Sequence, residues 1–351
     1  MKTLLSRSKV HLGKNSKIVK FLFTTFYLFR FNTDMTESQL YTSFRILLRQ
    51  LNNFSSNANN TLELANAIAL QSEYSLLPTY LHIVKNRLKA EIFSINFQVK
   101  GKQAAEKINQ WVNRKTRGKI DTILKGNPTA DTRMVLLNAL YFKGTWEHSF
   151  RKDKTKDMEF TYGKDKEVKV PMMNQAFEKL KYARFNEGEL VELPYSGNTL
   201  SMLLFLPADT STNSSSINDT ISSTFAQAAL RKQQESLEYK NRVNLMLPRF
   251  NISSSYSLKP ALQSMGIEAA FDPDSANFGR MTNQKDLMVA EVLHKAVVEV
   301  NEQGTEAAAV SAMRVRTRSR RNVVYFNRPF LFAIRYNRLQ LTLFAGIVNK
   351  P

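Results

Sequence analysis

The stretch His294–Arg321 reads HKAVVEVNEQGTEAAAVSAMRVRTRSRR. It opens with an apolar pattern, continues around Gly304 with small and mostly uncharged residues, and ends with five arginines in its last eight positions. The first part is typical of a buried segment. The arginine-rich end is typical of an exposed substrate for a trypsin-like protease. The sequence thus places a segment suited to burial directly beside one suited to exposure.

Apolar spacing along the rest of the chain predicts an α+β fold with large antiparallel sheets. Spacing of three to four residues predicts helices at 37–53, 77–93, 102–120 and 257–267. Short apolar runs predict strands at 62–71, 133–146, 166–173, 190–195, 200–207, 241–250, 294–304, 329–336 and 341–349. A serine-rich stretch at 210–223 predicts a surface loop. Helices come first and strands dominate later.

Composition excludes several classes of function. The 351 residues include no cysteine, which rules out disulfides, thiolate metal sites and a cysteine nucleophile. Only four histidines are present, which argues against a multi-histidine metal site, and we expect no metal. The chain has no G-x-S-x-G, H-E-x-x-H or Walker motif, so we expect no enzyme activity and no catalytic residues. The net charge of +20 favours polyanionic partners or is only a soluble basic surface. No nucleic-acid motif accompanies this charge, so we expect no specific nucleic-acid partner.

Seven sequence blocks, in this order along the chain, resemble the serpin family of serine protease inhibitors. They are INQWVNRKTRGKI (108–120), LLNALYFKGTW (136–146), VPMM (170–173), LVELPYSGNTLSMLLFLP (190–207), LPRFNISSSYSLKPALQSMGI (247–267), LHKAVVEVNEQGTEAAAVSA (293–312) and FNRPFLFAI (326–334). The resemblance covers residues 36–351 and implies one domain there. It implies the serpin fold, with three β-sheets, about eight or nine helices and an exposed reactive loop at about residues 302–322.

The resemblance implies inhibition by a change of shape. A protease cleaves the exposed loop and is acylated, and the freed loop inserts as a strand into the central sheet of a metastable fold. Such a strand needs one face without charges. One face from Thr305 onward carries Thr305, Ala307, Ala309, Ser311, Met313 and Val315. The charges Glu306, Arg314 and Arg316 all lie on the other face. The alternative is that the segment from Thr305 onward forms an Ala-rich helix, although its Thr, Val and Ser residues have low helix propensity.

The resemblance also locates the hinge of the loop and its reactive bond. The hinge residues that match inhibitory family members are Glu302, Gly304, Thr305, Glu306, Ala307, Ala308 and Ala309. Counting sixteen positions from Glu302 and counting back twelve from Phe330 both lead to Arg318, so the expected reactive bond is Arg318–Ser319. An arginine there suits proteases whose specificity pocket holds a carboxylate. The sequence RSRR ending at Arg321 also resembles a furin-type processing site, so a proprotein convertase is an alternative protease.

Three further residues match family positions in the sheet that opens. Asn138 and His294 correspond to the polar pair, called the shutter, that gates insertion at the centre of the sheet. Trp146 corresponds to the tryptophan at the top, where insertion begins. A simpler interpretation is that Asn138 and His294 form an ordinary buried polar pair and that Trp146 belongs to the core.

Residues 1–35 do not match the family and form an atypical basic and hydrophobic segment. They carry seven Lys or Arg and one Asp, and the run Ile18–Phe31 is signal-like but interrupted by charges. The family block of helices A–C, whose serines partner the shutter, is missing or replaced, which leaves either a partial gene model or a product unable to inhibit. Sequons at Asn53, Asn59, Asn213, Asn218 and Asn251 are candidate glycosylation sites. We expect a secreted, extracellular monomer.

The expected function is therefore inhibition of trypsin-like serine proteases through a covalent acyl complex, without a required cofactor. A heparin-like sulfated polysaccharide is a candidate activator through the basic run Lys85–Lys89, although a solvated helix face is the favoured explanation of that run. The alternatives are a non-inhibitory binding protein on the same fold and a truncated, inactive serpin.

Overall fold

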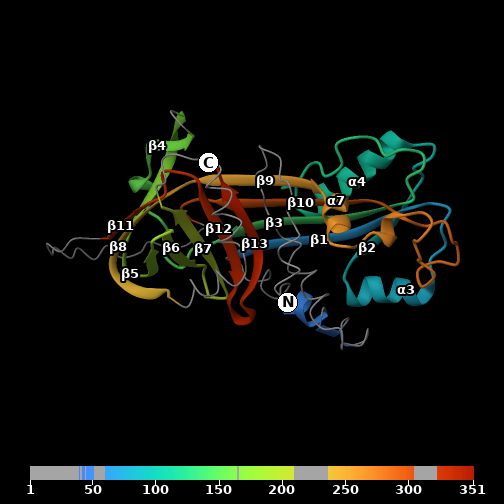
Figure 1. The fold of residues 1–351 in the computed structure, drawn as a ribbon, viewed down its shortest axis with the longest axis horizontal. Coiled ribbons are helices and arrows are strands. Elements are labelled where there is room, and N and C mark those ends of the chain that lie inside the picture. Colours follow the sequence, from blue (N-terminus) through green and yellow to red (C-terminus); the bar gives the residue numbers. More distant parts are fainter. Residues whose placement is uncertain are drawn as a thin grey trace.

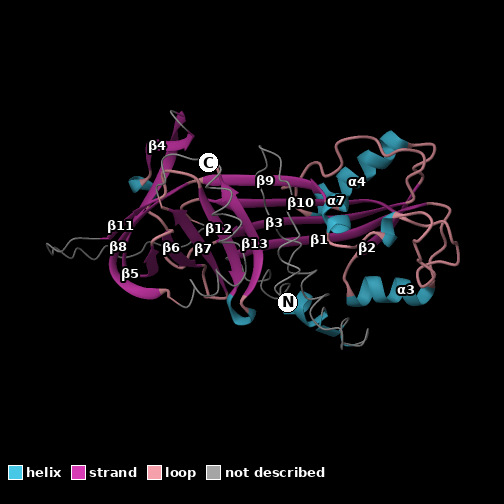
Figure 2. Cartoon of the chain, viewed as in Figure 1, coloured by secondary structure: helices cyan, strands magenta, loops and turns pink. Residues whose placement is uncertain are grey.

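A computed structural model describes residues 39, 42–43, 45–50, 60–163, 166–208, 236–303 and 322–351. Within these ranges the predicted α+β class is confirmed, since two large sheets are accompanied by a few short helices (Figures 1 and 2). No helix among the described residues is both long enough and apolar enough to cross a membrane. The reactive-loop residues 304–321 and the sequons at Asn53, Asn59, Asn213 and Asn218 lie outside the described residues, as does the predicted serine-rich loop.

Five strands form the first sheet, and four of them, β1, β3, β10 and β9, run side by side across the middle of Figure 1. They are β1 (Asn60–Gln71), β2 (Glu91–Ile95), β3 (Met134–Gly144), β9 (Phe250–Ser257) and β10 (Val289–Val300). Their order is β2-β1-β3-β10-β9. The β1–β3 and β10–β9 pairs are antiparallel, whereas the central pair β3–β10 is parallel.

Eight strands form the second sheet. They are β4 (Lys156–Gly163), β5 (Lys166–Phe185), β6 (Gly188–Pro194), β7 (Leu200–Pro207), β8 (Glu238–Pro248), β11 (Asn322–Tyr325), β12 (Phe330–Tyr336) and β13 (Leu341–Val348). The expected three sheets are thus joined into two hydrogen-bonded networks. The cause is β5, a strand of 20 residues whose first half pairs with β4 and whose second half pairs with β6, so that one continuous strand connects both parts.

The two sheets pack face to face over one main apolar core, and β12 and β13 cross the long strands in Figure 1. Phe142 from β3 contacts the ring of Phe344 from β13, with centroids 5.6 Å apart. Phe250 from β9 similarly contacts Phe330 and Phe332 from β12. Burial of such large aromatic side chains is the principal stabilising contribution of this interface.

Helices lie mainly at the end of the first sheet remote from β4. The described ranges hold the α-helices α3 (Pro78–His82), α4 (Gly101–Lys115) and α7 (Lys259–Ser264), the π-helical turn η1 (Ile83–Arg87) and the 3₁₀ turns η2 (Lys152–Lys154), η3 (Ala269–Phe271) and η4 (Asn337–Leu339). Residues 45–50 are also helical. The expected eight or nine helices refer to the whole chain, whereas this set covers the described ranges alone.

Most predicted elements are confirmed, but the helix expected at 77–93 is wrong in its last part. The helix ends in η1, Lys89 adopts a left-handed φ of 53°, and β2 then begins at Glu91. Pairing of β2 with β1, with Ala67 opposite Glu91, overrides the helical apolar spacing because the strand completes the edge of the sheet. The strands β4, β9 and β11 were not predicted.

Candidate functional site

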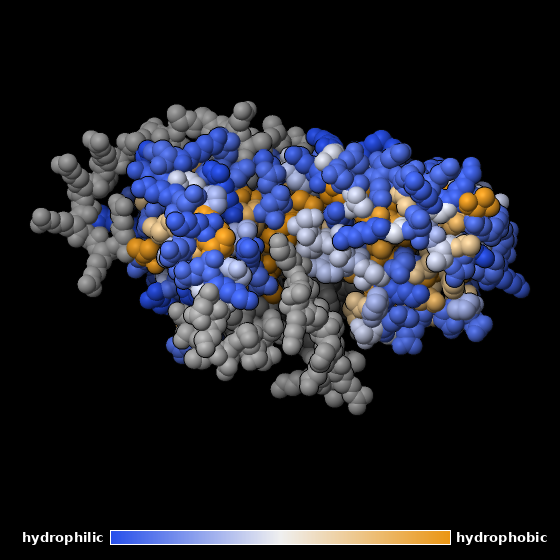
Figure 3. Space-filling model, turned by 90° about the horizontal axis from the view of Figure 1, so that it is seen from above, coloured by the Kyte–Doolittle hydropathy of each residue, from blue (hydrophilic) through white to orange (hydrophobic). Residues whose placement is uncertain are grey.

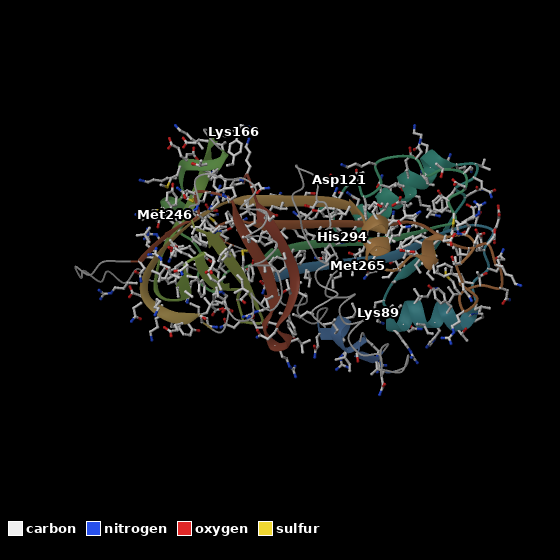
Figure 4. The ribbon with its side chains drawn as sticks, in the orientation of Figure 1. Lys89, Asp121, Lys166, Met246, Met265 and His294 are labelled. Atoms are coloured by element: carbon white, nitrogen blue, oxygen red, sulfur yellow. The ribbon has the colours of Figure 1, made fainter. Side chains whose placement is uncertain are left out.

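The centre of the first sheet carries a row of polar side chains across four neighbouring strands. In register order they are Asn66 on β1, Asn138 on β3, His294 on β10 and Tyr256 on β9. The Asn138 amide Nδ2 donates to Asn66 Oδ1 at 2.6 Å, and His294 Nδ1 lies 2.6 Å from Asn138 Oδ1. The structure therefore brings the two predicted shutter residues together, while their gating role stays a prediction. His294 is labelled in Figure 4, near the middle of the long strands.

The protonation of His294 follows from this geometry. Since Nδ2 of Asn138 donates to Asn66, its Oδ1 is an acceptor, so Nδ1 of His294 must carry the proton that it shares. The imidazole is 1% exposed, and burial lowers the pKa of His294 to about 4. The ring is consequently neutral near pH 7 and is the Nδ1–H tautomer. It stacks on Tyr256, with the two ring centroids 6.4 Å apart.

A second set of contacts joins β3 to β10 closer to the top of the sheet. The Glu299 carboxylate on β10 accepts a hydrogen bond from the Tyr141 hydroxyl at 3.0 Å and pairs with Lys143 Nζ at 2.8 Å. Burial by itself would raise the pKa of Glu299, but these two partners outweigh it and the pKa lies below its usual value. Separation of β3 from β10 must therefore break an ion pair as well as the central polar row.

Glu302, the first predicted hinge residue, fixes the segment after β10 to the residues that directly precede β9 and β4. Its side chain is 3% exposed and accepts bonds from the Arg249 guanidinium and from the Thr155 hydroxyl. Burial would raise the pKa of Glu302, whereas the bonds from Arg249 and Thr155 lower it below its ordinary value. Beside this contact is a hollow of about 250 Å³, lined by Lys152, Arg249, Asn301, Glu302 and Gln303. The start of the loop thus has a defined anchor.

Trp146 follows the end of β3 and connects it to the residues that follow β10. Its indole Nε1 donates to the carbonyl of Asn301 at 2.9 Å, and its ring stacks on Tyr195 at 4.5 Å between centroids. Gly144 makes this packing possible, because a Cβ there would lie 2.5 Å from the Tyr195 ring. Trp146 is 4% exposed, so it serves as core and as a connection between β3 and the base of the loop at once.

Sequence reasoning missed Asn66, Tyr141, Arg249 and Glu299 as parts of these clusters. A polar residue in an otherwise apolar strand, as in LELANAIALQ, was the available signal for Asn66. The remaining hinge residues, from Gly304 to Ala309, and the predicted reactive bond Arg318–Ser319 lie outside the described residues. The sequon residue Asn251 is described and is exposed on the edge strand β9. In the described ranges no cluster of three or more His, Asp or Glu is placed to hold a metal ion.

These features define a protein class: an α+β fold whose central sheet is closed by polar contacts between two parallel strands, with a loop leaving one of them. The family model described as Serpin (serine protease inhibitor) matches residues 10–351. The chain therefore belongs to the serpin family. The match begins upstream of residue 36, where the sequence blocks begin to resemble the family.

Named relatives and solved structures agree with this assignment. Iripin-8 of Ixodes ricinus is 37% identical over 297 residues, which cover 82% of this chain and 72% of that protein. Leukocyte elastase inhibitor of Xenopus tropicalis is 37% identical over 327 residues, covering 89% and 83%. Uncleaved ovalbumin has a TM-score of 0.79 at 29% identity, with 90% of this chain and 80% of that chain covered. Thyroxine-binding globulin in complex with thyroxine has a TM-score of 0.80 at 27% identity, with coverages of 95% and 88%.

Proposed function

We propose that the protein inhibits trypsin-like serine proteases as a suicide substrate. The protease serine attacks the Arg318 carbonyl, the Arg318–Ser319 bond breaks, and the amine of Ser319 leaves while Arg318 remains esterified to the enzyme. The freed loop then inserts between β3 and β10 before water can hydrolyse the ester. The observation that carries this proposal is the parallel pairing of β3 with β10. A chain that turns back after β10 runs antiparallel to both β3 and β10, so its backbone can form hydrogen bonds with each of these two strands.

The ends of the loop are placed suitably for such a step. Gln303 follows β10 in the first sheet, whereas Asn322 begins β11 in the second sheet, where it pairs with β8. Cleavage after Arg318 leaves fifteen residues, 304–318, attached to β10, which extend to about 50 Å as a strand. β10 itself has 12 residues, or about 40 Å. The freed segment is therefore long enough to run the length of the sheet.

The proposed specificity rests on the side chain of Arg318. A guanidinium forms two parallel hydrogen bonds with a carboxylate, which favours proteases whose specificity pocket is acidic. The relative named leukocyte elastase inhibitor is an inhibitor by its name, which supports inhibition as the reaction class without supporting this specificity. The proposed partners are a trypsin-like protease and a heparin-like polyanion that acts as an activator. The proposed location is extracellular, with the protein monomeric and Asn251 accessible to glycosylation.

The test is to mix the purified protein with trypsin and with thrombin. An adduct that survives SDS, together with release of a peptide spanning residues 319–351, is the expected result. R318A should abolish the adduct, whereas the matched change R316A should leave it. Release of a peptide that begins at Asn322 would instead indicate processing after RSRR. Complete hydrolysis of the loop without any adduct, for every trypsin-like protease tried, would overturn the proposal.

A non-inhibitory binding protein is the second candidate, because thyroxine-binding globulin, in complex with thyroxine, has the same fold. The two candidates differ in the stability of nicked protein. Insertion adds a strand to the first sheet, so inhibitory protein cleaved after Arg318 should melt at a clearly higher temperature than intact protein. Identical melting of the two forms would favour the binding protein.

A further inference from the structure

The hollow beside the base of the loop is walled by residues from separate parts of the chain. Lys152 belongs to η2, Arg249 directly precedes β9, and Asn301, Glu302 and Gln303 follow β10. Its volume of about 250 Å³ is below the roughly 300–1,000 Å³ of pockets that hold drug-sized ligands. A ligand that fills it must therefore be compact. We call this hollow, with its five lining residues, the hinge hollow.

Both cations of the hinge hollow have hydrogen-bond donors that no described residue uses. The Lys152 side chain is exposed and forms no hydrogen bond or ion pair with any other described residue. Arg249 donates from Nε and Nη2 to one carboxylate oxygen of Glu302, which takes up only part of the five N–H groups of a guanidinium. The Arg249 side chain is 43% exposed, so its remaining N–H groups are open to a ligand.

The segment that supplies Lys152 makes the surroundings of the hinge hollow positive. Residues 151–157 read RKDKTKD, with four Lys or Arg against two Asp, which gives a net charge of +2. Arg249 and Glu302 cancel each other, because burial, which would raise the pKa of Glu302, is outweighed by its bonds from Arg249 and Thr155, and the carboxylate stays ionised. A ligand with two negative charges therefore balances this region.

The hinge hollow lies at a part of the molecule that a charged ligand can approach through water. η2 and the following strand β4 belong to the end of the molecule that Figure 3 shows from above, and the surface there is mainly hydrophilic. Lys152, Lys154 and Lys156 are all exposed. The hollow is thus an accessible depression with cations at its wall and along its rim.

We propose that the hinge hollow binds a small dicarboxylate, with one carboxylate on Arg249 and the other on Lys152. A guanidinium presents parallel N–H groups that match a carboxylate, whereas the Lys152 ammonium is a compact charge that binds a carboxylate from several directions. The side-chain amide of Gln303 forms no hydrogen bond with any other described residue, so it can bond to a polar group between the two carboxylates. The site is independent of the proposed inhibitory function.

Other anions fit the hinge hollow less well. A monocarboxylate pairs with one cation and leaves the other without a partner. Inorganic phosphate carries its charge on a single small centre, which leaves most of the 250 Å³ unfilled. A sulfated polysaccharide needs an extended basic track, whereas five residues enclose this hollow. Two carboxylates separated by a short carbon chain match both the charge and the volume.

Ligand binding and the anchor of the loop share one residue. Arg249 and the Thr155 hydroxyl both donate to the Glu302 carboxylate. A dicarboxylate on Arg249 and Lys152 therefore competes with Glu302 for the charge of the guanidinium. Removal of the charge of Glu302 should consequently strengthen ligand binding, because the two interactions are linked through Arg249.

The test is calorimetric titration of the full chain with succinate at physiological ionic strength. K152Q should weaken binding about tenfold, since it removes one charge-assisted hydrogen bond. K152R keeps the charge and should retain binding within about threefold. The matched control is K154Q, which removes the same charge from an exposed residue of the same turn that does not line the hollow. It should change the affinity by less than about twofold.

A second variant tests the competition at Arg249. E302Q keeps the size of the side chain and an acceptor for Thr155 but removes the negative charge, so succinate should bind at least about threefold more tightly than to the wild type. Weaker or unchanged binding to a folded E302Q would overturn the assignment of Arg249 as a ligand-binding residue. If melting shows that E302Q does not fold, the comparison of K152Q with K154Q decides the site, since the Lys152 side chain bonds to no described residue.

Four outcomes would overturn the proposal itself. They are no binding of succinate to the wild type, an equal loss of affinity in K152Q and K154Q, acetate or phosphate binding as tightly as succinate, and an equal rise of melting temperature with succinate in the wild type and in K152Q. The last would indicate a general effect of the solute on the folded state rather than binding at a site. None of these measurements involves a protease, so a failure of the proposed inhibition leaves the result for the hollow unaffected.

Discussion

His294 on β10 and Asn138 on β3 lie opposite each other in register, and the imidazole Nδ1 is 2.6 Å from the side-chain oxygen of Asn138. The two residues are 156 positions apart in the chain. Asn66 extends this contact by a hydrogen bond and Tyr256 extends it by ring stacking, so the row crosses four strands of the five-stranded sheet. The contact between Asn138 and His294 holds β3 against β10, so a strand that enters between them has to break it, whereas Asn66 on β1 and Tyr256 on β9 support the two residues from outside that gap.

Acidification should weaken the closed sheet through His294. Burial holds the pKa of His294 at about 4, below the 6.5 of an ordinary histidine, so the unfolded chain binds the proton more readily. The stability that this residue contributes is therefore complete above pH 6.5 and is lost as the pH falls toward 4, up to about 3 kcal/mol. Glu299 and Glu302, whose pKa values are also lowered, lose their contributions only below about pH 4.5.

Urea denaturation at a series of pH values checks this expectation. Between pH 6.5 and 4.5 the free energy of unfolding should fall in the wild type and stay nearly level in H294Q. The exposed His82 offers a matched control, since H82Q should retain the wild-type slope. A slope in H294Q equal to that of the wild type would contradict the assignment.

Asn66 should be the next most sensitive member of the polar row. N66A removes the acceptor for Asn138 Nδ2 and leaves that donor unsatisfied inside the sheet, at a cost of about 1–2 kcal/mol. The midpoint of urea unfolding measures the loss. N241A, at an exposed position of β8, should change stability by less than about 0.5 kcal/mol. Equal effects of both substitutions would mean that the row contributes nothing specific.

Two tyrosines should respond in opposite directions to the same change. The Tyr195 hydroxyl is fully buried, and no hydrogen-bond partner for it lies among the described residues, so Y195F should stabilise the native form by about 1 kcal/mol. The Tyr141 hydroxyl donates to Glu299, so Y141F should destabilise it by a similar amount. Thermal melting of both variants is the measurement, and a lower melting temperature for Y195F would refute the assignment of the Tyr195 hydroxyl as an unsatisfied group.

Gly144 should tolerate no side chain. In G144A the new Cβ would lie 2.5 Å from Cδ1 of Tyr195 and 2.7 Å from Cζ of Phe142, so the stacking of Tyr195 on Trp146 has to shift. Overpacking of this kind costs about 1–3 kcal/mol. Gly126 has open space at the same position and provides the control, because G126A should be neutral or slightly stabilising. Indistinguishable melting temperatures for the two variants would show that the region relaxes freely.

Much of the fold was predictable because its elements carry local patterns. Helix α4 has the apolar spacing, the basic last turn and the following glycine of a regular helix, and β3 and β10 are long apolar runs. β9 was overlooked although Phe250, Ile252 and Ser254 alternate with exposed residues, because serines obscured its period of two. β2 could not be predicted locally, since its partner β1 decides it.

The candidate site was predictable only in part. The resemblance marked Asn138, His294, Trp146 and Glu302, but not the residues that face them. Arg249 meets Glu302 because Arg249 directly precedes β9, whose first residue Phe250 lies opposite Val300 of β10. No spacing along the chain contains that information.

The amino-acid order alone indicated the family, and it predicted both a segment at 305–316 whose three charges share one face of a strand and an arginine offered to a protease. These are properties of neighbours in the chain, and a period of two or a run of small residues is visible without any fold. The tertiary structure decided which polar groups hold β3 against β10 and which side chains line the hollow at the base of the loop. Such contacts join residues far apart in the chain, and they depend on strand order and register, which the packing of the whole molecule selects.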